Sequence, residues 1–457
     1  MTFDYQQALD YIYGFTNYEV KPQYRYSPDI IDPTRPARLL ELLGNPHRDY
    51  PTVHVAGTKG KGSVAAICAS AFHAAGLRVG LYTSPHLQCF TERIQLDGAN
   101  IPQKELAALV EEVRPVIAHV EGITTFEVVT ALAFLYFSRS LVDVGVIEVG
   151  LGGRLDATNV LLPLVSVITS LSYDHTYLLG DTLAEIAVEK GGIIKPGVPV
   201  VSADQPEEAR VVLERLAAER NSPLTLIGRD YWYRQVGQDL VHQTFRAGRT
   251  GEPGSLYLLP LVGLHQAHNA TVALAALELV RQGGRLPALT DEAIRQGMAG
   301  VRWQARFQLL NRRPVVIVDG AHNVAAVARL RETLESLFSG RRIILIFGVT
   351  ADKDVPHMLE TLAPVATEII VTEANHPRAA LPSDLTQMLA AMGRFAHSAP
   401  TVLQALEQSW AMSGPDDVIC ITGSLFVAGD ALFAWEQFAE PTGALRAAPV
   451  EELTEVR

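Results

Sequence analysis

The chain has 457 residues, of which 48% are hydrophobic, and a formal net charge of -12. This length exceeds one ordinary hydrophobic core, so two domains are expected. The acidic balance, with 38 Lys and Arg against 50 Asp and Glu and no basic tract, disfavours extended nucleic-acid binding. There is no membrane-length apolar run or signal-peptide pattern, and the three cysteines are far apart. These features predict a cytoplasmic protein without nucleic-acid or membrane partners.

The first half of the chain reads as an α/β domain. Residues 5–15 are predicted to be helical, and a proline-marked loop region follows up to residue 50. Continuous apolar runs then alternate with helical stretches, such as the one over residues 64–75. The runs lie at residues 52–56, 79–82, 142–149, 165–170 and 198–201. Because continuous apolarity is typical of parallel strands covered on both faces, a doubly wound sheet is predicted.

The pattern changes after residue 222. Short alternating runs over residues 222–262 predict a small antiparallel patch, a helix follows over 268–282, and residues 283–301 are polar. A second series of strands is then predicted at residues 315–318, 342–347, 368–371 and 418–421. We therefore expect an N-terminal P-loop NTPase-like domain with a doubly wound parallel sheet (1–300), a smaller C-terminal Rossmann-like α/β domain (301–439) and a frayed tail (440–457).

The most informative motif follows the first predicted strand. It consists of Gly57, Thr58, Lys59, Gly60, Lys61, Gly62 and Ser63, in the order strand, loop and helix start. Glycines let backbone N–H groups face a phosphate, the helix start adds about half a positive charge, and a lysine binds the β and γ phosphates. The motif departs from the general pattern, because Val55 replaces the first glycine and the hydroxyl comes after Gly62. A surface turn that caps a helix is the alternative.

Charged side chains follow the other strands of the first domain. Glu148 ends an apolar run, and ligands of open α/β sheets bind at the carboxyl ends of strands, so this residue is placed to bind a metal. A solvent-facing acid is the alternative. A glycine-rich loop over 150–159 comes next, and Asp174 and His175 follow another run. Lys190 ends a helical stretch, where lysines are usually solvated partners of the helix dipole.

Four polar motifs occupy the second half of the chain. They lie at residues 318–323, 348–354, 375–378 and 422–425, and three of them directly follow an apolar run. Since both halves carry polar residues at predicted strand ends, the sequence favours one cleft between the two domains.

Taken in order, the motifs resemble the folylpolyglutamate synthase and dihydrofolate synthase family, a branch of the Mur-type amide ligases. The resemblance covers roughly residues 30–430. It rests on residues 54–63, 82–87, 92–94, 148–159, 174–175, 189–190, 265–266 with Asn269, 306–307, 319–323, 352–354 and 423–425. Two departures are seen: Lys59 stands where the family usually has asparagine, and Gly191 stands where alanine usually follows the lysine.

The resemblance implies a cofactor and metal site. ATP would be bound by Thr58, Lys59, Gly60, Lys61, Gly62, Ser63, Asn269, Arg306 and Asp319. Magnesium would be bound by Ser84, Glu148 and His175, and a second Mg²⁺ by a carbamylated Lys190, which replaces the solvated interpretation of that lysine. A neutral lysine amine adds CO₂ to give an anionic carbamate, so this chemistry is reasonable. Lys61, Lys190 and His322 would be the catalytic residues.

The resemblance also implies a pterin site. Its residues would be Asp29, Ile30, Ile31, Thr124, Thr125, Phe126, Glu127, Leu155, Asp156 and Ala157. An aromatic ring beside hydroxyl and carboxyl groups suits a flat heterocycle with polar edges, although Phe126 is equally suited to the core.

The implied reaction joins L-glutamate to dihydropteroate or to a folate through an acyl phosphate made from ATP. The segment 153–159 resembles the bacterial form that acts on both substrates, so a bifunctional, monomeric enzyme is the first choice. A folylpolyglutamate synthase alone, or another Mur-type ligase, is the nearest alternative. A P-loop switch without ligase activity leaves the second domain unexplained.

Overall fold

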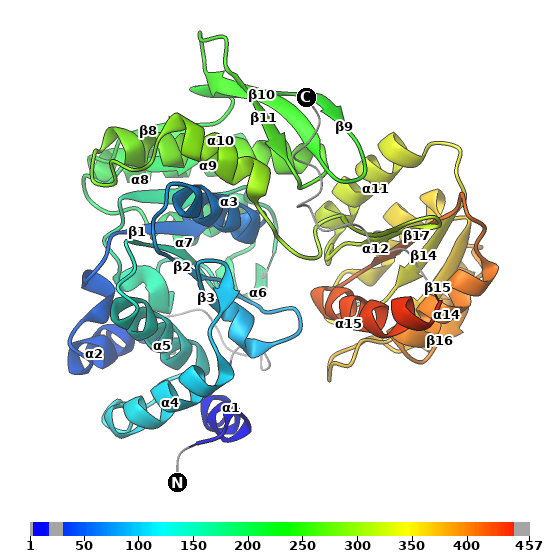
Figure 1. Cartoon of the computed structure of the whole chain (residues 1–457), viewed down its shortest axis with the longest axis horizontal. Helices are drawn as coiled ribbons and strands as arrows, with labels where there is room; N and C mark the ends of the chain where they lie inside the picture. The colour runs from blue at the N-terminus through cyan, green and yellow to red at the C-terminus, as the bar shows by residue number, and fades with distance from the viewer. Residues whose placement is uncertain (1–2, 18–30, 175, 443–457) are drawn as a thin grey trace. The chain divides into compact units, whose positions relative to one another are not determined.

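The structure is a computed structural model of the chain, and it describes residues 3–17, 31–174 and 176–442. It divides into two compact units (Figure 1). The first comprises residues 1–236, 244–259 and 266–302, and the second comprises 237–243, 260–265 and 303–457. None of the described helices combines the length and the apolarity that crossing a lipid bilayer requires.

The first unit is built on an eight-stranded sheet of order β4-β3-β2-β5-β1-β6-β7-β8. Its strands are β1 (Thr52–Ala56), β2 (Val79–Tyr82), β3 (Ile94–Leu96), β4 (Ala99–Asn100), β5 (Val144–Glu148), β6 (Val165–Ile168), β7 (Val200–Ser202) and β8 (Leu224–Leu226). The strands from β2 to β8 in this order run parallel, whereas β3 and β4 form an antiparallel edge. The predicted doubly wound parallel sheet is thereby confirmed, with an antiparallel edge that the sequence had not indicated.

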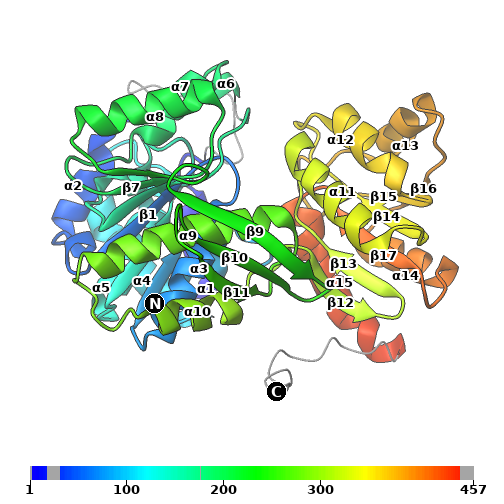
Figure 2. The ribbon, with the colours of Figure 1, turned by 90° about the horizontal axis from the view of Figure 1, so that it is seen from above.

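Helices cover both faces of this sheet, and Figure 2 shows α7 and α8 on one side and α3, α9 and α10 on the other. The helices are α1 (Tyr5–Tyr13), α2 (Thr34–Leu42), α3 (Lys61–Ala74), α4 (Gln103–Ile117), α5 (Thr125–Arg139), α6 (Thr176–Leu179), α7 (Leu183–Gly191), α8 (Glu207–Glu219), α9 (Leu264–Gln282) and α10 (Asp291–Gly300). Each strand of the sheet centre is buried along its whole length, as the continuous apolar runs predicted.

Two helices lie where the sequence indicated none. Residues 34–42 were predicted to be loop, yet they form α2, because Pro36 falls in the first turn, where proline is tolerated, and Leu39 and Leu40 are buried. The polar stretch 283–301 contains α10, whose N-cap Thr290 accepts a hydrogen bond from a backbone amide.

Helix α10 packs unusually close to α3. A Cβ atom on Gly297 would lie 2.3 Å from the Cα of Ala71, and Ser70 Oγ donates to the carbonyl of Gly297 at 2.7 Å. Glycine is therefore required at this crossing, because any side chain would separate the two helices.

Most of the predicted antiparallel patch is a small three-stranded sheet of order β11-β10-β9, whereas β8, at the start of the predicted range, pairs parallel with β7 in the main sheet. Its strands are β9 (Tyr231–Gln238), β10 (Gln243–Arg249) and β11 (Ser255–Leu259). Short loops join successive neighbours, and such loops permit only antiparallel pairing.

The second unit is a six-stranded sheet of order β12-β13-β17-β14-β15-β16, in which only the edge strand β12 is antiparallel. Its strands are β12 (Gln308–Arg312), β13 (Val315–Val318), β14 (Ile343–Phe347), β15 (Glu368–Thr372), β16 (His397–Ala399) and β17 (Val418–Thr422). Its helices are α11 (Val324–Phe338), α12 (Val355–Leu362), α13 (Pro382–Ala391), α14 (Val402–Met412) and α15 (Leu425–Thr442). Helices α11, α12 and α13 cover one face, and α14 and α15 cover the other (Figure 2). The predicted Rossmann-like α/β fold of this half is confirmed.

Candidate active site

The glycine-rich loop lies between β1 and α3 and is held against the end of β6. The backbone amides of Thr58 and Lys59 both donate to the carbonyl of Ser170, at 3.0 and 3.1 Å. Gly60 is the N-cap of α3 with a φ of 86°, and no side chain caps this helix in the described part of the chain. The helix start thus keeps the positive electrostatic end that attracts phosphate. Sequence reasoning missed Ser170, although it stands at the end of a predicted strand.

Asn269 of α9, which the resemblance assigns to nucleotide binding, lies directly beside this loop. A Cβ atom on Gly60 would come within 2.3 Å of its Oδ1 atom. The side chain is 6% exposed, and its Nδ2 donates to Gln266 at 3.1 Å. The amide is therefore fixed next to the turn at which α3 begins.

Two of the three predicted magnesium ligands are neighbours. The backbone amide of Ser84 donates to Glu148 Oε2 at 3.3 Å, and Lys61 Nζ lies 3.9 Å from Glu148 Oε1. A buried carboxylate beside a serine is an oxygen donor set suited to Mg²⁺. The third ligand, His175, lies outside the described residues, and the described residues contain no cluster of three or more His, Cys, Asp or Glu side chains that would hold a metal.

Lys190 is buried, so the interpretation of a solvated lysine at a helix end is wrong. Its Nζ donates to the carbonyl of Gly57 at 2.9 Å, in the glycine-rich loop itself. Burial, together with the positive charge of Lys61, lowers the pKa of Lys190 from 10.5 to about 7. An amine with such a pKa is partly neutral at physiological pH and is available as a nucleophile.

Asp156 organises the second glycine-rich loop. Its Oδ2 accepts hydrogen bonds from the amides of Gly150 and Leu151, at 3.1 and 3.0 Å, and its Oδ1 accepts from the amide and hydroxyl of Thr158. Burial raises the pKa of this carboxyl group, and these hydrogen bonds oppose the shift. The flanking Leu155 and Ala157 are also buried.

The predicted pterin segment at the start of α5 is largely engaged within the protein. Thr124 and Glu127 form a reciprocal capping box, and Arg35 Nε donates to Glu127 at 3.1 Å. The hydroxyl of Thr125 donates to the carbonyl of Ile12 at 3.0 Å. These contacts give the three residues structural roles, and their predicted contact with a ligand stays a prediction.

Phe126 differs from its neighbours because its ring faces the second glycine-rich loop. A Cβ atom on Gly150 would lie 2.4 Å from its Cζ atom. Ile31 is half-buried and packs on the apolar cluster that contains Leu155. Asp29 and Ile30 lie outside the described residues.

The second unit brings its three predicted residues together at the loop that follows β13, with Arg306 reaching it from the segment before β12. Asp319 accepts hydrogen bonds from the amides of Phe307 and Ala321, at 2.8 and 2.9 Å. Burial raises the pKa of this carboxyl group, and the charge of Arg306 opposes the shift. A Cβ atom on Gly320 would lie 2.9 Å from Arg306 Nη1, and His322 Nδ1 donates to the carbonyl of Gly320 at 2.9 Å.

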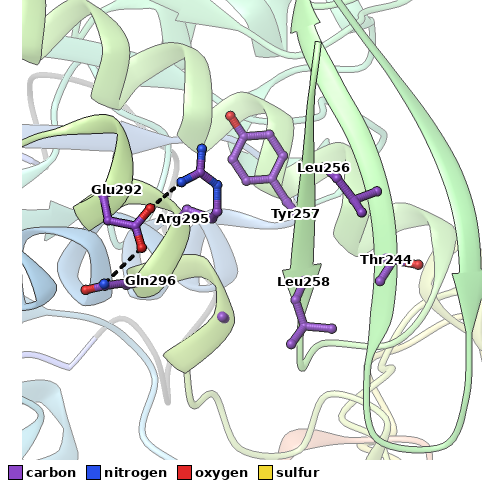
Figure 3. Close-up of a pocket in the computed structure, with 8 residues that line it drawn as sticks. Thr244, Leu256, Tyr257, Leu258, Glu292, Arg295 and Gln296 are labelled. Atoms are coloured by element: carbon purple, nitrogen blue, oxygen red, sulfur yellow. Dashed lines mark hydrogen bonds and ion pairs between the residues drawn. The ribbon is translucent and has the colours of Figure 1, made fainter. Parts of the chain in front are cut away.

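A separate groove of about 330 Å³ lies between α10 and strands β10 and β11 (Figure 3). Leu256 and Leu258 line it from one side, and the ion pair of Glu292 and Arg295 lines it from the other. None of the predicted site residues lies in its wall, so the groove is distinct from the candidate site.

Comparison with known proteins identifies both halves of the chain. The Mur ligase middle domain matches residues 55–277, and the Mur ligase glutamate ligase domain matches residues 305–425. A dihydrofolate synthase/folylpolyglutamate synthase of Bacillus subtilis is 35% identical over 446 residues, covering 93% of this chain and 98% of the relative.

Solved structures agree with this match. A Mycobacterium tuberculosis folylpolyglutamate synthase complexed with ADP gives a TM-score of 0.82 at 33% identity, covering 94% of this chain and 99% of that one. An Escherichia coli structure in complex with DHPP and ADP gives a TM-score of 0.79 at 30% identity, covering 88% and 93%.

Fold and site thus define a Mur-type ligase. More particularly, the chain belongs to the dihydrofolate synthase/folylpolyglutamate synthase family. The resemblance predicted from the motifs is confirmed, and the expected class of enzyme, an ATP-dependent amide ligase, is confirmed with it.

Proposed function

We propose that this enzyme joins L-glutamate to dihydropteroate and to the γ-carboxylate of folate glutamates, with ATP as the energy source. The observation that carries this proposal is the group of charges around Gly57. Lys190 is hydrogen-bonded to that residue's carbonyl, and Lys61, four residues further along the chain, pairs with Glu148. An uncapped helix start, a mobile cation and a buried carboxylate are the parts that phosphoryl transfer requires.

The reaction has two steps. A substrate carboxylate oxygen attacks the γ-phosphorus of ATP, so ADP leaves and an acyl phosphate forms. The amine of glutamate then attacks the acyl carbon, phosphate leaves, and the amine loses a proton as the amide forms. Lys61 and the amides at the start of α3 stabilise the charge on the transferred phosphoryl group, and the protein must exclude water until the amine arrives.

Magnesium fits the oxygen donors at Ser84 and Glu148, with His175 as the third proposed ligand. When bound there, the ion neutralises phosphate charge and polarises the γ-phosphate. We assign the ATP phosphates to the loop 58–63 with Asn269, further nucleotide contacts to Arg306 and Asp319, and a catalytic role to His322. What supports the last three is that Arg306 and His322 both lie against Gly320, which directly follows Asp319.

We further propose that Lys190 becomes carbamylated. Its depressed pKa supplies the neutral amine that CO₂ requires, and the product anion suits a second Mg²⁺. A carbamate carbonyl resonance in ¹³C NMR after incubation with ¹³C-bicarbonate, present in the wild type and lost in Lys190→Met, tests this. A spectrum without that resonance argues for an unmodified lysine.

A product assay tests the reaction. Purified enzyme with dihydropteroate, L-glutamate, ATP and Mg²⁺ should form dihydrofolate, and tetrahydrofolate as acceptor should gain glutamate. Glutamylated folate without dihydrofolate favours a folylpolyglutamate synthase alone. ATP hydrolysis with no amide product from either acceptor contradicts the proposal.

A further inference from the structure

His54 is a fully buried polar residue at the centre of the main sheet. It lies in β1, where its backbone pairs with Ile147 of β5 and Ser166 of β6. Its Nε2 atom is 2.8 Å from Thr158 Oγ1. A buried imidazole in a central strand is costly unless it is hydrogen-bonded, so this contact fixes the ring.

The direction of this hydrogen bond follows from its neighbours. The hydroxyl of Thr158 donates to Asp156 Oδ1, so its oxygen accepts from His54 Nε2. Burial lowers the pKa of His54 to about 3, which keeps the ring neutral, and Nδ1 has no partner among the described residues. The single ring proton is therefore on Nε2, where it has an acceptor.

The chain of hydrogen bonds ends on the second glycine-rich loop. After Thr158 the chain continues to Asp156, whose carboxylate accepts hydrogen bonds from the backbone amides of Gly150 and Leu151. Four donors thus occupy a carboxylate that offers about four acceptor positions. The side chains of His54, Thr158 and Asp156 thus form one continuous link between the sheet core and this loop.

The loop held in this way touches two parts of the candidate site. Gly150 lies against the ring of Phe126, and a Cβ atom on Gly153 would come within 3.0 Å of the carbonyl of Lys190. Any shift of the loop therefore changes the surface beside Phe126.

We infer that His54 is a positioning residue for the pteridine end of the acceptor substrate, acting through Thr158 and Asp156 on the loop 150–153. This inference rests on the proposed function, because it assigns a kinetic effect to that substrate. The amides of Thr58 and Lys59 in the ATP phosphate loop are held by the carbonyl of Ser170, which lies outside the relay of His54, Thr158 and Asp156, so we expect the relay to affect the acceptor more than ATP.

The kinetic test uses two relay variants and their combination. His54→Leu and Thr158→Val should each raise KM for dihydropteroate about 10-fold, because a buried partner is left without its hydrogen bond. KM for ATP should stay within about twofold of the wild type. His54→Gln should restore most of the acceptor affinity, because its amide donates from nearly the same position. KM for dihydropteroate in the double variant should be no higher than in Thr158→Val alone.

A matched control is available at His47. This histidine is also buried, its pKa is lowered to about 4 by burial, and its Nδ1 has no partner in the described ranges. His47→Leu should leave KM for dihydropteroate unchanged. Equal rises in both KM values, additive effects of His54→Leu and Thr158→Val, or no rescue by glutamine would overturn the inference.

A spectroscopic measurement separates this inference from the proposed function. In histidine-selective ¹⁵N NMR, His54 should be a neutral Nε2–H tautomer from pH 5 to 8, and Thr158→Val should shift its Nε2 resonance. A proton on Nδ1 contradicts the relay whatever the enzyme's activity. If the relay is present and no glutamate is ligated, the proposed function fails and the relay stands.

Discussion

Helices α3 and α11 begin after the same arrangement of strand and loop, but their first backbone amides differ in whether a side chain caps them. Each follows a parallel strand and a short polar loop. Helix α11 is capped, because Asn323 accepts a hydrogen bond from the amide of Ala326, and in the loop before it Asp319 accepts the amide of Ala321. Helix α3 begins at Gly60 without any side-chain cap from a described residue.

This difference leaves the start of α3 open to an anion, whereas the start of α11 is closed by its own side chain. An N-cap side chain adds roughly 1 kcal/mol to stability, and the amide that it satisfies is then occupied. At α3 that stability is absent and the amides remain oriented toward a ligand anion. The uncapped start also lies beside the buried side chains of Glu148 and Lys190 and the half-buried side chain of Lys61.

The largest effect is expected at Lys61. Lys61→Ala should lower kcat/KM for glutamate ligation about 1000-fold, because the charge that stabilises the transferred phosphoryl group is lost. The neighbouring Lys59→Asn, which introduces the residue usual in the family, is the matched control and should change the rate less than about threefold. Initial rates of ADP release with both substrates present measure this. A Lys61→Ala enzyme with near-normal turnover would show that the α3 loop is not the phosphate site.

The next largest effect is expected at Gly60. A Cβ atom there would meet Asn269 Oδ1, and the φ of 86° disfavours any residue with a side chain. Gly60→Ala should weaken ATP binding about 100-fold, measured by calorimetry. Gly340→Ala is a control with a similar positive φ and no atom within 4 Å, so it should bind ATP normally.

The lowered pKa of Lys190 predicts that the free energy of unfolding depends on pH. Between pH about 7 and 10.5 the unfolded chain carries this proton and the folded chain does not, so the contribution of Lys190 to stability rises with pH in that window. Lys190→Met removes the buried charge and should stabilise the apoenzyme by about 2 kcal/mol at pH 6. The difference in stability between Lys190→Met and the wild type should become smaller toward pH 9. Denaturant melts in CO₂-free buffer measure it. An advantage that grows with pH would contradict the assigned pKa direction.

The smallest effect is expected at the capped helix. Asn323→Ala should lower the free energy of unfolding of the second unit by about 1 kcal/mol, because a helix cap is lost. Urea melts measure this value. Calorimetry should show that Asn323→Ala binds ATP much more tightly than Gly60→Ala does. An equal loss of ATP affinity in both variants would contradict the proposed difference between the two helix starts.

The sequence predicted the parts of the molecule that follow from local pattern. Continuous apolar runs located the central strands, and the order of motifs identified the family. The burial of Lys190 was not visible locally, because its partner Gly57 is 133 residues away. The antiparallel edge β3–β4 and helix α10 also depend on tertiary packing, which overrides weak local signals.

The ligand-binding residues predicted from motifs differ in whether their side chains already have partners within the protein. Asn269 was assigned to the nucleotide from a motif, and the structure places it beside Gly60, although its contact with a nucleotide stays a prediction. Thr125 and Glu127 have hydrogen-bond partners within the protein, which a motif does not reveal. Three assignments, Asp29, Ile30 and His175, fall outside the described residues and stay predictions.

The close crossing of α10 and α3 has a consequence for fragments of this enzyme. The match to the Mur ligase middle domain ends at residue 277, whereas the first unit, which contains most of that match, continues through α10 to residue 302. A fragment cut at the end of that match would leave Ala71 and its neighbours on α3 uncovered, since Gly297 packs directly on them. The end of the matched family domain and the end of the compact unit therefore differ, and we predict that an expressible fragment of the first unit must include α10.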